Sequence, residues 1–309
     1  MCKSGKNGFW KTSIQLKNNQ KLKIPHTIRN LDSICISNLI SPGIDISSKN
    51  FFLDDLSIPK SHKEPITIST KSQYVEIDEL DAKFCNKFLF NFKNTYELCI
   101  NAFNTAKHLC FNNKFIIGNS LKSLRIKNRI LHPEYLVLNE NLESLYIQEL
   151  KSCKNLKLNS NLKKLEIYYL KTAYGLILND NLEKLILPNI TTAYGLTLND
   201  NLERLILPHL ISVKNLILNE KLKFLKLDSL VNAKNLKLNE KLEILELNGI
   251  ENGEGLVFND KLRIVQFKSL KTAKNLILPR SIEKVIIPKV PYLSALRKNH
   301  PKAQFIILK

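Results

Sequence analysis

The chain has 309 residues, of which 44% are hydrophobic and 24% are charged, and it carries a formal net charge of +19. This length and composition allow a large buried core. No stretch approaches the roughly 18 uninterrupted apolar residues that a membrane-spanning helix needs. The six cysteines are scattered, without the spacing of a zinc site or a disulfide framework. This usage favours reduced thiols and a cytosolic compartment.

Residues 1–20 are predicted to form a basic arm. The first thirty residues hold seven Lys or Arg and no Asp or Glu, and no apolar block follows them. We therefore expect no Sec-type signal peptide. The protein is expected in the cytoplasm, or in a host cytoplasm after secretion by a route without such a signal.

Residues 21–130 are predicted to hold degenerate copies of a repeat together with an N-terminal cap. The spacing Leu31-x-x-Ile34-x-Ile36 matches Leu142-x-x-Leu145-x-Ile147 farther along the chain. Insertions separate these early copies, so their boundaries stay open. Residues 57–72, with two prolines, are the most loop-like stretch.

Residues 131–290 contain the regular repeat. From residue 136, seven units of twenty residues follow without a gap, such as LILNDNLEKLILPNITTAYG and then LTLNDNLERLILPHLISVKN, and an eighth begins at Leu276. In each unit, alternation like that of Leu185 and Leu187 is typical of a strand with one buried face. One unit cannot cover its own apolar face, so the units must stack. We predict a β-rich repeat solenoid with twenty residues per coil.

Residue types at two recurrent positions predict local features of each coil. The first holds only Gly or Asn, the residues that best tolerate positive φ, which predicts a left-handed turn in every coil. It comprises Asn155, Gly175, Gly195, Asn215, Asn235, Gly255 and Asn275. The second is Asn139 and its equivalents every twenty residues, replaced once by Pro279. Stacked Asn side chains there are predicted to form a ladder of hydrogen bonds between coils.

Residues 291–309 are predicted to form a C-terminal cap, because the end of a solenoid must cover its last apolar surface. Pro291 suits the start of a short helix. Residues 304–308 follow as an edge strand.

The motif Leu278-Pro279-Arg280-Ser281-Ile282-Glu283-Lys284-Val285-Ile286-Ile287 resembles the LPxxLxxLxV core of bacterial leucine-rich repeats of twenty residues. Such repeats occur in secreted effectors of the YopM and invasion plasmid antigen H type. The resemblance covers about residues 131–290 and implies a leucine-rich-repeat-like fold and an effector-like interaction protein. The unit departs from the family in its second half, where Leu or Ile replaces the family's Asn after the strand.

The outward positions of the predicted strands form the candidate partner-binding site. If Leu185 and Leu187 point inward, then Ile186, Ile206 and Phe224 form an exposed apolar stripe on successive coils, and such patches commonly mark partner sites. The alternatives are that these β-branched residues are present only because they favour strand formation, or that another segment covers them. The predicted partner-binding residues are Tyr146, Tyr168, Ile186, Ile206, Phe224 and Ile244.

No residue pattern indicates catalysis. The six histidines are isolated, no phosphate-binding or nucleophile motif occurs, and the repeated acids recur only because the unit recurs. We therefore predict a protein-interaction scaffold that is not an enzyme and that needs no metal or cofactor. One alternative is nucleic-acid binding through the basic N-terminal half, for which Phe9, Trp10, Lys11 and Lys17 are the hint. Another is a purely structural repeat protein.

Overall fold

The computed structural model describes backbone and side chains for residues 74–76, 95–100, 120–130 except 128, and 133–308 except 135, 137, 234 and 235. For the remaining strand residues before 131, and for residue 135, it describes the backbone alone. The chain forms two compact units, one of residues 1–150 and 155–162, the other of residues 151–154 and 163–309. The described part is a parallel β-solenoid of about ten coils of about twenty residues, with one short C-terminal helix. The predicted fold class is confirmed.

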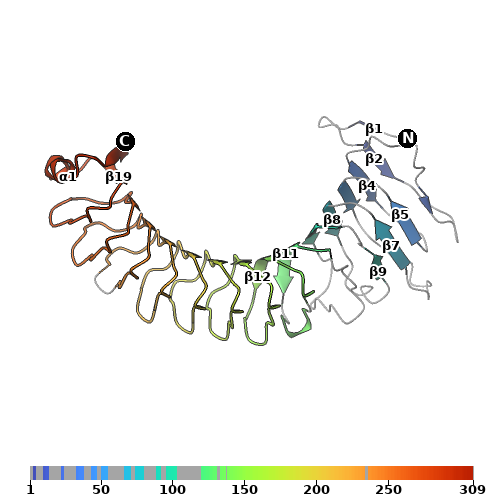
Figure 1. Cartoon of the computed structure of the whole chain (residues 1–309). Helices are drawn as coiled ribbons and strands as arrows, with labels where there is room; N and C mark the ends of the chain where they lie inside the picture. Colours follow the sequence, from blue (N-terminus) through green and yellow to red (C-terminus); the bar gives the residue numbers. More distant parts are fainter. Residues whose placement is uncertain are drawn as a thin grey trace. The chain divides into compact units, whose positions relative to one another are not determined.

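The first unit contains a main parallel sheet and a second, smaller sheet (Figure 1). Parallel strands stack in the order β2, β4, β6, β8, β10, β11 and β12, and β1 pairs with β2 antiparallel. The smaller sheet has the order β3, β5, β7 and β9. A 3-10 turn, η2 (Pro133–Tyr135), follows β11. The strand bounds are β1 (Lys3–Ser4), β2 (Trp10–Ser13), β3 (Leu22–Lys23), β4 (Ser33–Ser37), β5 (Gly43–Ile46), β6 (Asn50–Asp54), β7 (Ile66–Thr70), β8 (Tyr74–Glu79), β9 (Phe88–Asn91), β10 (Glu97–Ala102), β11 (Ser123–Ile130) and β12 (Ser144–Leu150).

The register supports the prediction that the N-terminal part repeats the later pattern. Ile34 is linked through the strand pairs β4 to β12 to the column that holds Leu98, Leu124 and Leu145. Ile34 thus occupies the position that the spacing assigned to it. Two strands, β1 and β2, lie inside the segment predicted as a basic arm. The loop prediction for residues 57–72 is wrong over β7, because Ile66–Thr70 is rich in β-branched residues and pairs with β5 and β9.

The second unit is a stack of short parallel strands in register, each twenty residues after the last (Figure 1, yellow to red). Leu165 pairs with Leu185 as predicted, and Leu185 pairs with Leu205. The strands are β13 (Lys164–Ile167), β14 (Lys184–Ile186), β15 (Arg204–Ile206), β16 (Phe224–Lys226), β17 (Ile244–Glu246), β18 (Ile264–Gln266), β19 (Lys284–Pro288) and β20 (Gln304–Leu308).

The core of the second unit runs through the middle of the coils. Side chains at the strand centre and two residues later, such as Leu185 and Leu187, are fully buried in each coil from β13 to β19. The third apolar position, as at Ile190, and the small residue after it, as at Ala193, are buried too. Burying one aliphatic side chain stabilises the fold by roughly 1.5–3 kcal/mol, and this requires the neighbouring coil.

The left-handed turn after the small residue is confirmed wherever it is described. Gly175, Gly195 and Gly255 have φ of 81°, 74° and 77°, and Asn155, Asn215 and Asn275 have φ of 64–67°. Asn235, the seventh member, lies outside the described residues. The turn begins with a hydrogen bond that sequence analysis missed. A Ser, Thr or Asn side chain accepts from the backbone N–H two residues on, as Thr172 does from Tyr174 at 3.2 Å.

The asparagine ladder exists, but its acceptors are backbone carbonyls rather than other Asn side chains. The Asn219 amide nitrogen donates to the carbonyl oxygens of Asp200 at 3.2 Å and Leu202 at 2.8 Å. Asn159, Asn199 and Asn239 repeat this pair of bonds on the preceding coil. In the coil with Pro279, the Ser281 hydroxyl donates instead to the Leu262 carbonyl at 2.7 Å. In these coils the ladder therefore ties the coil to the one before it at the turn into the strand.

The C-terminal cap has the predicted composition. The helix α1 (Leu293–Asn299) buries Leu293 and Leu296, and β20 continues the sheet with Val285 opposite Phe305. The helix begins two residues after Pro291, because Tyr292 adopts a left-handed conformation with φ of 66°.

Candidate functional site

The outward side chains of β13 to β18 form two rows, which we call the strand face. Parallel pairing in register aligns equivalent residues of successive coils. The first row is Lys164, Lys184, Arg204, Phe224, Ile244 and Ile264. The second row is Glu166, Ile186, Ile206, Lys226, Glu246 and Gln266.

The structure brings most of the predicted site residues together on this face. Ile186, Ile206 and Ile244 are half-buried, and Tyr168, directly after β13, is 37% exposed. Tyr146 belongs to the first unit, where the Arg125 guanidinium lies 4.8 Å from its ring centre. It is therefore not grouped with the other five.

Phe224 requires a correction, because it is only 8% exposed. The Arg204 guanidinium lies over its ring at 4.3 Å from the centroid, and Ile244 pairs with it from the other side. A cation over an aromatic face is attracted by the ring quadrupole, so Arg204 covers Phe224 favourably. The predicted continuous apolar stripe is therefore interrupted at β16, and its accessible apolar part is Ile186 and Ile206.

Three cations stand side by side at the start of the first row. Lys164 forms an ion pair with Glu166 within its own strand. Among the described residues, neither Lys184 nor Arg204 forms an ion pair. Desolvation lowers the pKa of Lys184, and the positive charges of Lys164 and Arg204 lower it further, while the Glu166 carboxylate acts in the opposite direction. This part of the strand face therefore carries two cations that have no ion-pair partner among the described residues, beside apolar side chains.

The other half of the strand face satisfies its own charges. The Lys226 ammonium lies 2.7 Å from a Glu246 carboxylate oxygen and 3.3 Å from one of Asp228. The Asn248 amide donates to Asp228, and the Gln266 amide donates to Asn248 at 2.9 Å. Partly buried groups with internal partners gain less from a ligand than unpaired ones. The part of the strand face over β13 to β15 is therefore the part whose charges are available to a ligand.

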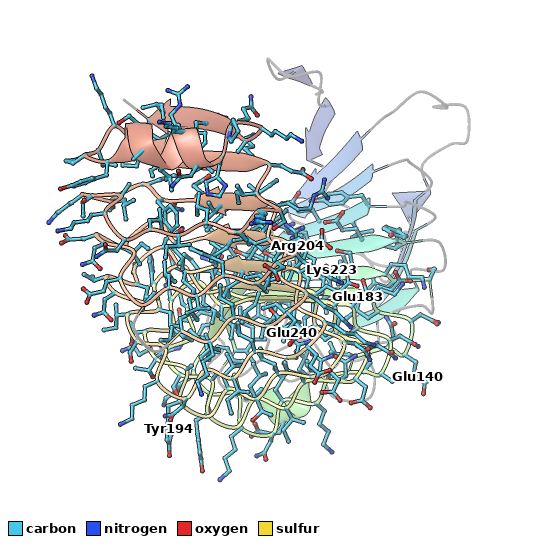
Figure 2. All side chains as sticks on the ribbon, turned by 60° about the vertical axis from the view of Figure 1, so that its left-hand side comes forward. Glu140, Glu183, Tyr194, Arg204, Lys223 and Glu240 are labelled. Atoms are coloured by element: carbon cyan, nitrogen blue, oxygen red, sulfur yellow. The ribbon has the colours of Figure 1, made fainter. Side chains whose placement is uncertain are left out.

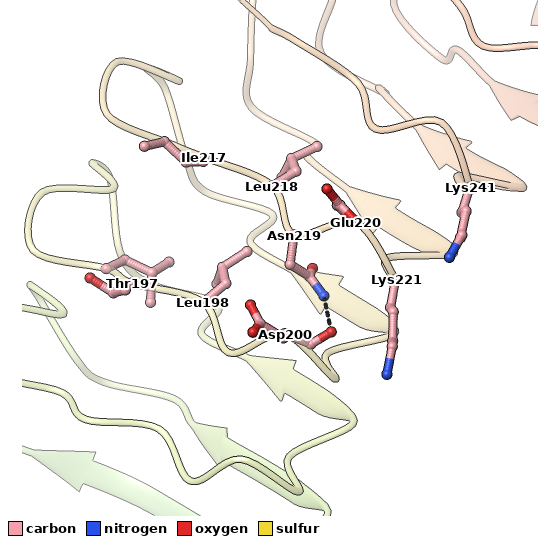
Figure 3. A pocket seen from close by; sticks show the side chains of 10 residues that line it. Thr197, Leu198, Asp200, Ile217, Leu218, Asn219, Glu220, Lys221 and Lys241 are labelled. Atoms are coloured by element: carbon pink, nitrogen blue, oxygen red, sulfur yellow. Dashed lines mark hydrogen bonds between the residues drawn. The ribbon is translucent and has the colours of Figure 1, made fainter.

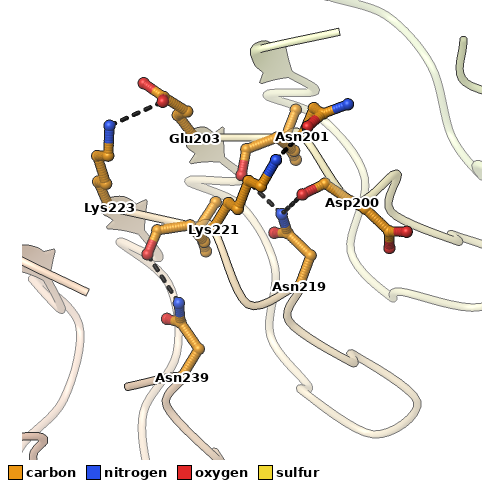
Figure 4. A network of polar contacts seen from close by, with 9 residues as sticks. Asp200, Asn201, Glu203, Asn219, Lys221, Lys223 and Asn239 are labelled. Atoms are coloured by element: carbon orange, nitrogen blue, oxygen red, sulfur yellow. Dashed lines mark hydrogen bonds and ion pairs between the residues drawn. The ribbon is translucent and has the colours of Figure 1, made fainter. Parts of the chain in front are cut away.

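A cavity of about 580 Å³ opens between two coils beside residues 196–200 and 217–221 (Figure 3). Its rim carries two carboxylates, Asp200 and Glu220, and two ammonium groups, Lys221 and Lys241. The adjoining turn is braced by polar contacts between coils, including Lys221 with the Asn201 oxygen at 2.6 Å and Lys223 with Glu203 at 2.7 Å (Figure 4). Because the two carboxylates and the two ammonium groups balance, this cavity does not select a ligand by the sign of its charge.

The described residues contain no group of three or more His, Cys, Asp or Glu placed to hold a metal ion. No helix in the described part of the chain is long and apolar enough to cross a membrane. Comparison of the chain with protein-family models gave no match, and comparison with curated protein sequences gave none.

The repeat pattern places Lys164, Lys184 and Arg204 at outward positions beside the apolar stripe, but the predicted partner-binding residues do not include them. The signal was present in the aligned repeats, because these residues share one position in three consecutive units. The aligned repeats do not reveal which of the three cations has an anionic partner.

Proposed function

We propose that the protein is a non-enzymatic interaction scaffold that binds an extended, acidic polypeptide segment with apolar side chains on the strand face over β13 to β15. The observation that carries the proposal is the pair of cations without an ion-pair partner, Lys184 and Arg204, beside the accessible Ile186 and Ile206. A carboxylate from a partner would relieve the repulsion between these cations, and apolar side chains would cover the two isoleucines.

The chemistry of this surface matches known protein interfaces. Arg and aromatic residues are enriched in them, and charge complementarity raises association rates and selects partners. Pro188 and Pro208 lie two residues after Ile186 and Ile206 and are themselves half-buried, which extends the rigid apolar surface beyond the strands. The resemblance of the repeat to bacterial leucine-rich-repeat effectors also supports an interaction protein, acting in a cytoplasm or a host cytoplasm.

The test is selection of binders from a random peptide library displayed on phage, with the full chain as bait. We expect enrichment of peptides that combine Asp or Glu with apolar residues. The variant Lys184→Glu/Arg204→Glu should lose these peptides, and Ile186→Ser/Ile206→Ser should weaken them at least tenfold, since anchor truncations commonly lose 2 kcal/mol or more.

The matched control is Lys223→Glu/Arg263→Glu, which reverses two exposed cations of the same unit that already have carboxylate partners. This control should retain the selected peptides. Selection of basic peptides, or equal binding by the strand-face variants and the control, would contradict the proposal. The nucleic-acid alternative depends on Phe9, Trp10, Lys11 and Lys17, whose side chains lie outside the described part of the chain, so no contact favours it as a second function.

A further inference from the structure

A second surface of the same unit carries exposed apolar side chains that the strand face does not explain. It lies on the segments that follow the third apolar position of each coil, and we call it the loop face. Tyr194 extends outward there, away from the strands beside Arg204 (Figure 2). The apolar side chains of the loop face are Tyr174, Ile177, Tyr194, Ile211, Ile217 and Val231, each between 57% and 81% exposed.

Within the segments of the loop face the charge has one sign. The nearest acids along the chain, such as Asp200 and Glu220, follow three residues later, and these two line the cavity that Ile217 also lines. Residues 151–154, 171–177, 191–197, 211–217 and 231–237 contain no Asp or Glu. The described cations of these segments are all exposed: Lys151, Lys154, Lys171, Lys214 and Lys237. In the next segment, residues 251–257, the pattern changes, because Glu251 and Glu254 enter and Glu251 pairs with Lys271 at 2.7 Å.

Two properties decide what kind of partner fits. The rings of Tyr174 and Tyr194 stack on each other, with centroids 6.0 Å apart and planes within 12°, so no base fits between them. Anchor residues of protein interfaces fill enclosed, desolvated pockets, whereas these apolar side chains are each more than half exposed. A bilayer surface accepts separate apolar side chains, accommodates tyrosine at the headgroup level and attracts lysine when its lipids are anionic.

We propose that the loop face binds the surface of an anionic lipid bilayer, with Tyr174, Tyr194, Ile177 and Ile217 at the headgroup level and the lysines against lipid phosphates and carboxylates. This surface is separate from the strand face, so the scaffold can hold a polypeptide while its loop face rests on a membrane. The two proposals stand on different residues and fail independently.

The test is co-sedimentation of the full chain with vesicles of phosphatidylcholine containing about one third phosphatidylserine. Binding should be at least tenfold weaker to pure phosphatidylcholine and should decrease with salt. Lys171→Gln/Lys214→Gln/Lys237→Gln should lower the partition coefficient about 100-fold, since each lysine near such a surface contributes about fivefold. Ile177→Ser/Ile217→Ser should lower it at least about tenfold.

The matched control is Val257→Ser, at the same coil position and equally exposed (77%) but in the segment that contains Glu251 and Glu254. It should change binding by no more than about twofold, and Ile186→Ser/Ile206→Ser on the strand face should leave binding unchanged. Each of these surface substitutions should leave the far-ultraviolet circular dichroism spectrum intact.

If the wild type binds the vesicles and the loop-face variants bind them equally well, the proposal is overturned. The attraction to the vesicles would then come from another basic region of the chain. Loss in the lysine variant without loss in Ile177→Ser/Ile217→Ser would also overturn it, because a soluble polyanion such as RNA would then suffice as the ligand. Failure of peptide selection on the strand face would leave the vesicle result unaffected.

Discussion

Replacing Gly195 by alanine tests how closely the coils stack at the left-handed turn. A Cβ at this position would lie 2.8 Å from the Tyr174 Cα and 3.2 Å from its ring carbon Cδ2, closer than real Cβ atoms approach backbone. Gly175 is the matched control, because it has the same turn conformation, yet its Cβ would lie 3.3 Å from the nearest atom, the Lys154 Cα. The pair separates backbone strain from steric overlap.

The expected costs follow from these two contributions. A non-glycine residue in the left-handed region costs about 1–2 kcal/mol, and reduced freedom of the unfolded chain offsets about 0.4–1 kcal/mol of this for alanine. Gly175→Ala should therefore destabilise the protein by about 1 kcal/mol. Gly195→Ala adds overpacking against backbone, which typically costs about 1–3 kcal/mol, for a total of about 2–4 kcal/mol.

The assay is urea denaturation followed by circular dichroism, with Gly175→Asn as a further control. Asparagine occupies this turn at Asn155, Asn215 and Asn275 with φ of 64–67°, so Gly175→Asn should cost less than Gly175→Ala. Equal destabilisation by the two alanine substitutions would refute the close approach at Gly195. A neutral or stabilising Gly175→Ala would refute the backbone strain.

Three further predictions concern single side chains. Asn219→Ala should lower the free energy of unfolding by about 1–3 kcal/mol, because two carbonyls on the preceding coil lose their donor; Lys241→Ala, at the exposed turn, should change it by less than about 0.5 kcal/mol in the same titration. Burial raises the pKa of the Cys153 thiol to about 12, so peptide-resolved mass spectrometry should find it alkylated by iodoacetamide at about pH 8 only after unfolding. The lowered pKa of Lys184 means that its charge destabilises the folded state below that pKa, and that the penalty disappears as pH rises toward 10.5. Urea denaturation should therefore be measured below and above that pH window. The free energy of unfolding of the wild type, relative to that of Lys184→Met, should be higher above the window. An unchanged difference between the two proteins would contradict the lowered pKa.

The regular coils could be predicted from the sequence because every structural requirement recurs at the same position. Gly or Asn before Leu176 and its equivalents predicts positive φ, and the alternation at Leu185 and Leu187 predicts the buried side of a strand. The N-terminal part lacks such repetition. The sheet that contains β7 was not predicted, since Ile66–Thr70 is a short β-branched run directly after Pro65, and a single short run does not reveal its pairing partners.

The candidate site could be predicted only as a face. Alternation predicts that Phe224 points to the outer side of its strand, but its burial depends on Arg204, which lies twenty residues earlier and folds over the ring. The asparagine ladder shows the same limit, because the acceptors of Asn219 are carbonyls of the preceding coil that any residue type supplies. Contacts between coils depend on rotamers and on neighbours in space, and neither is written in a repeat pattern.

The proposed polypeptide site is tested most directly by photo-crosslinking from two single positions of the full chain. Ile206 on the strand face and Ile217 on the loop face are each replaced by p-benzoylphenylalanine and irradiated with a labelled acidic peptide obtained from the phage selection. We expect a crosslink from position 206 that Lys184→Glu abolishes, and none from position 217. A crosslink from position 217 alone, or from both positions equally, would contradict the assignment of the strand face as the polypeptide-binding surface.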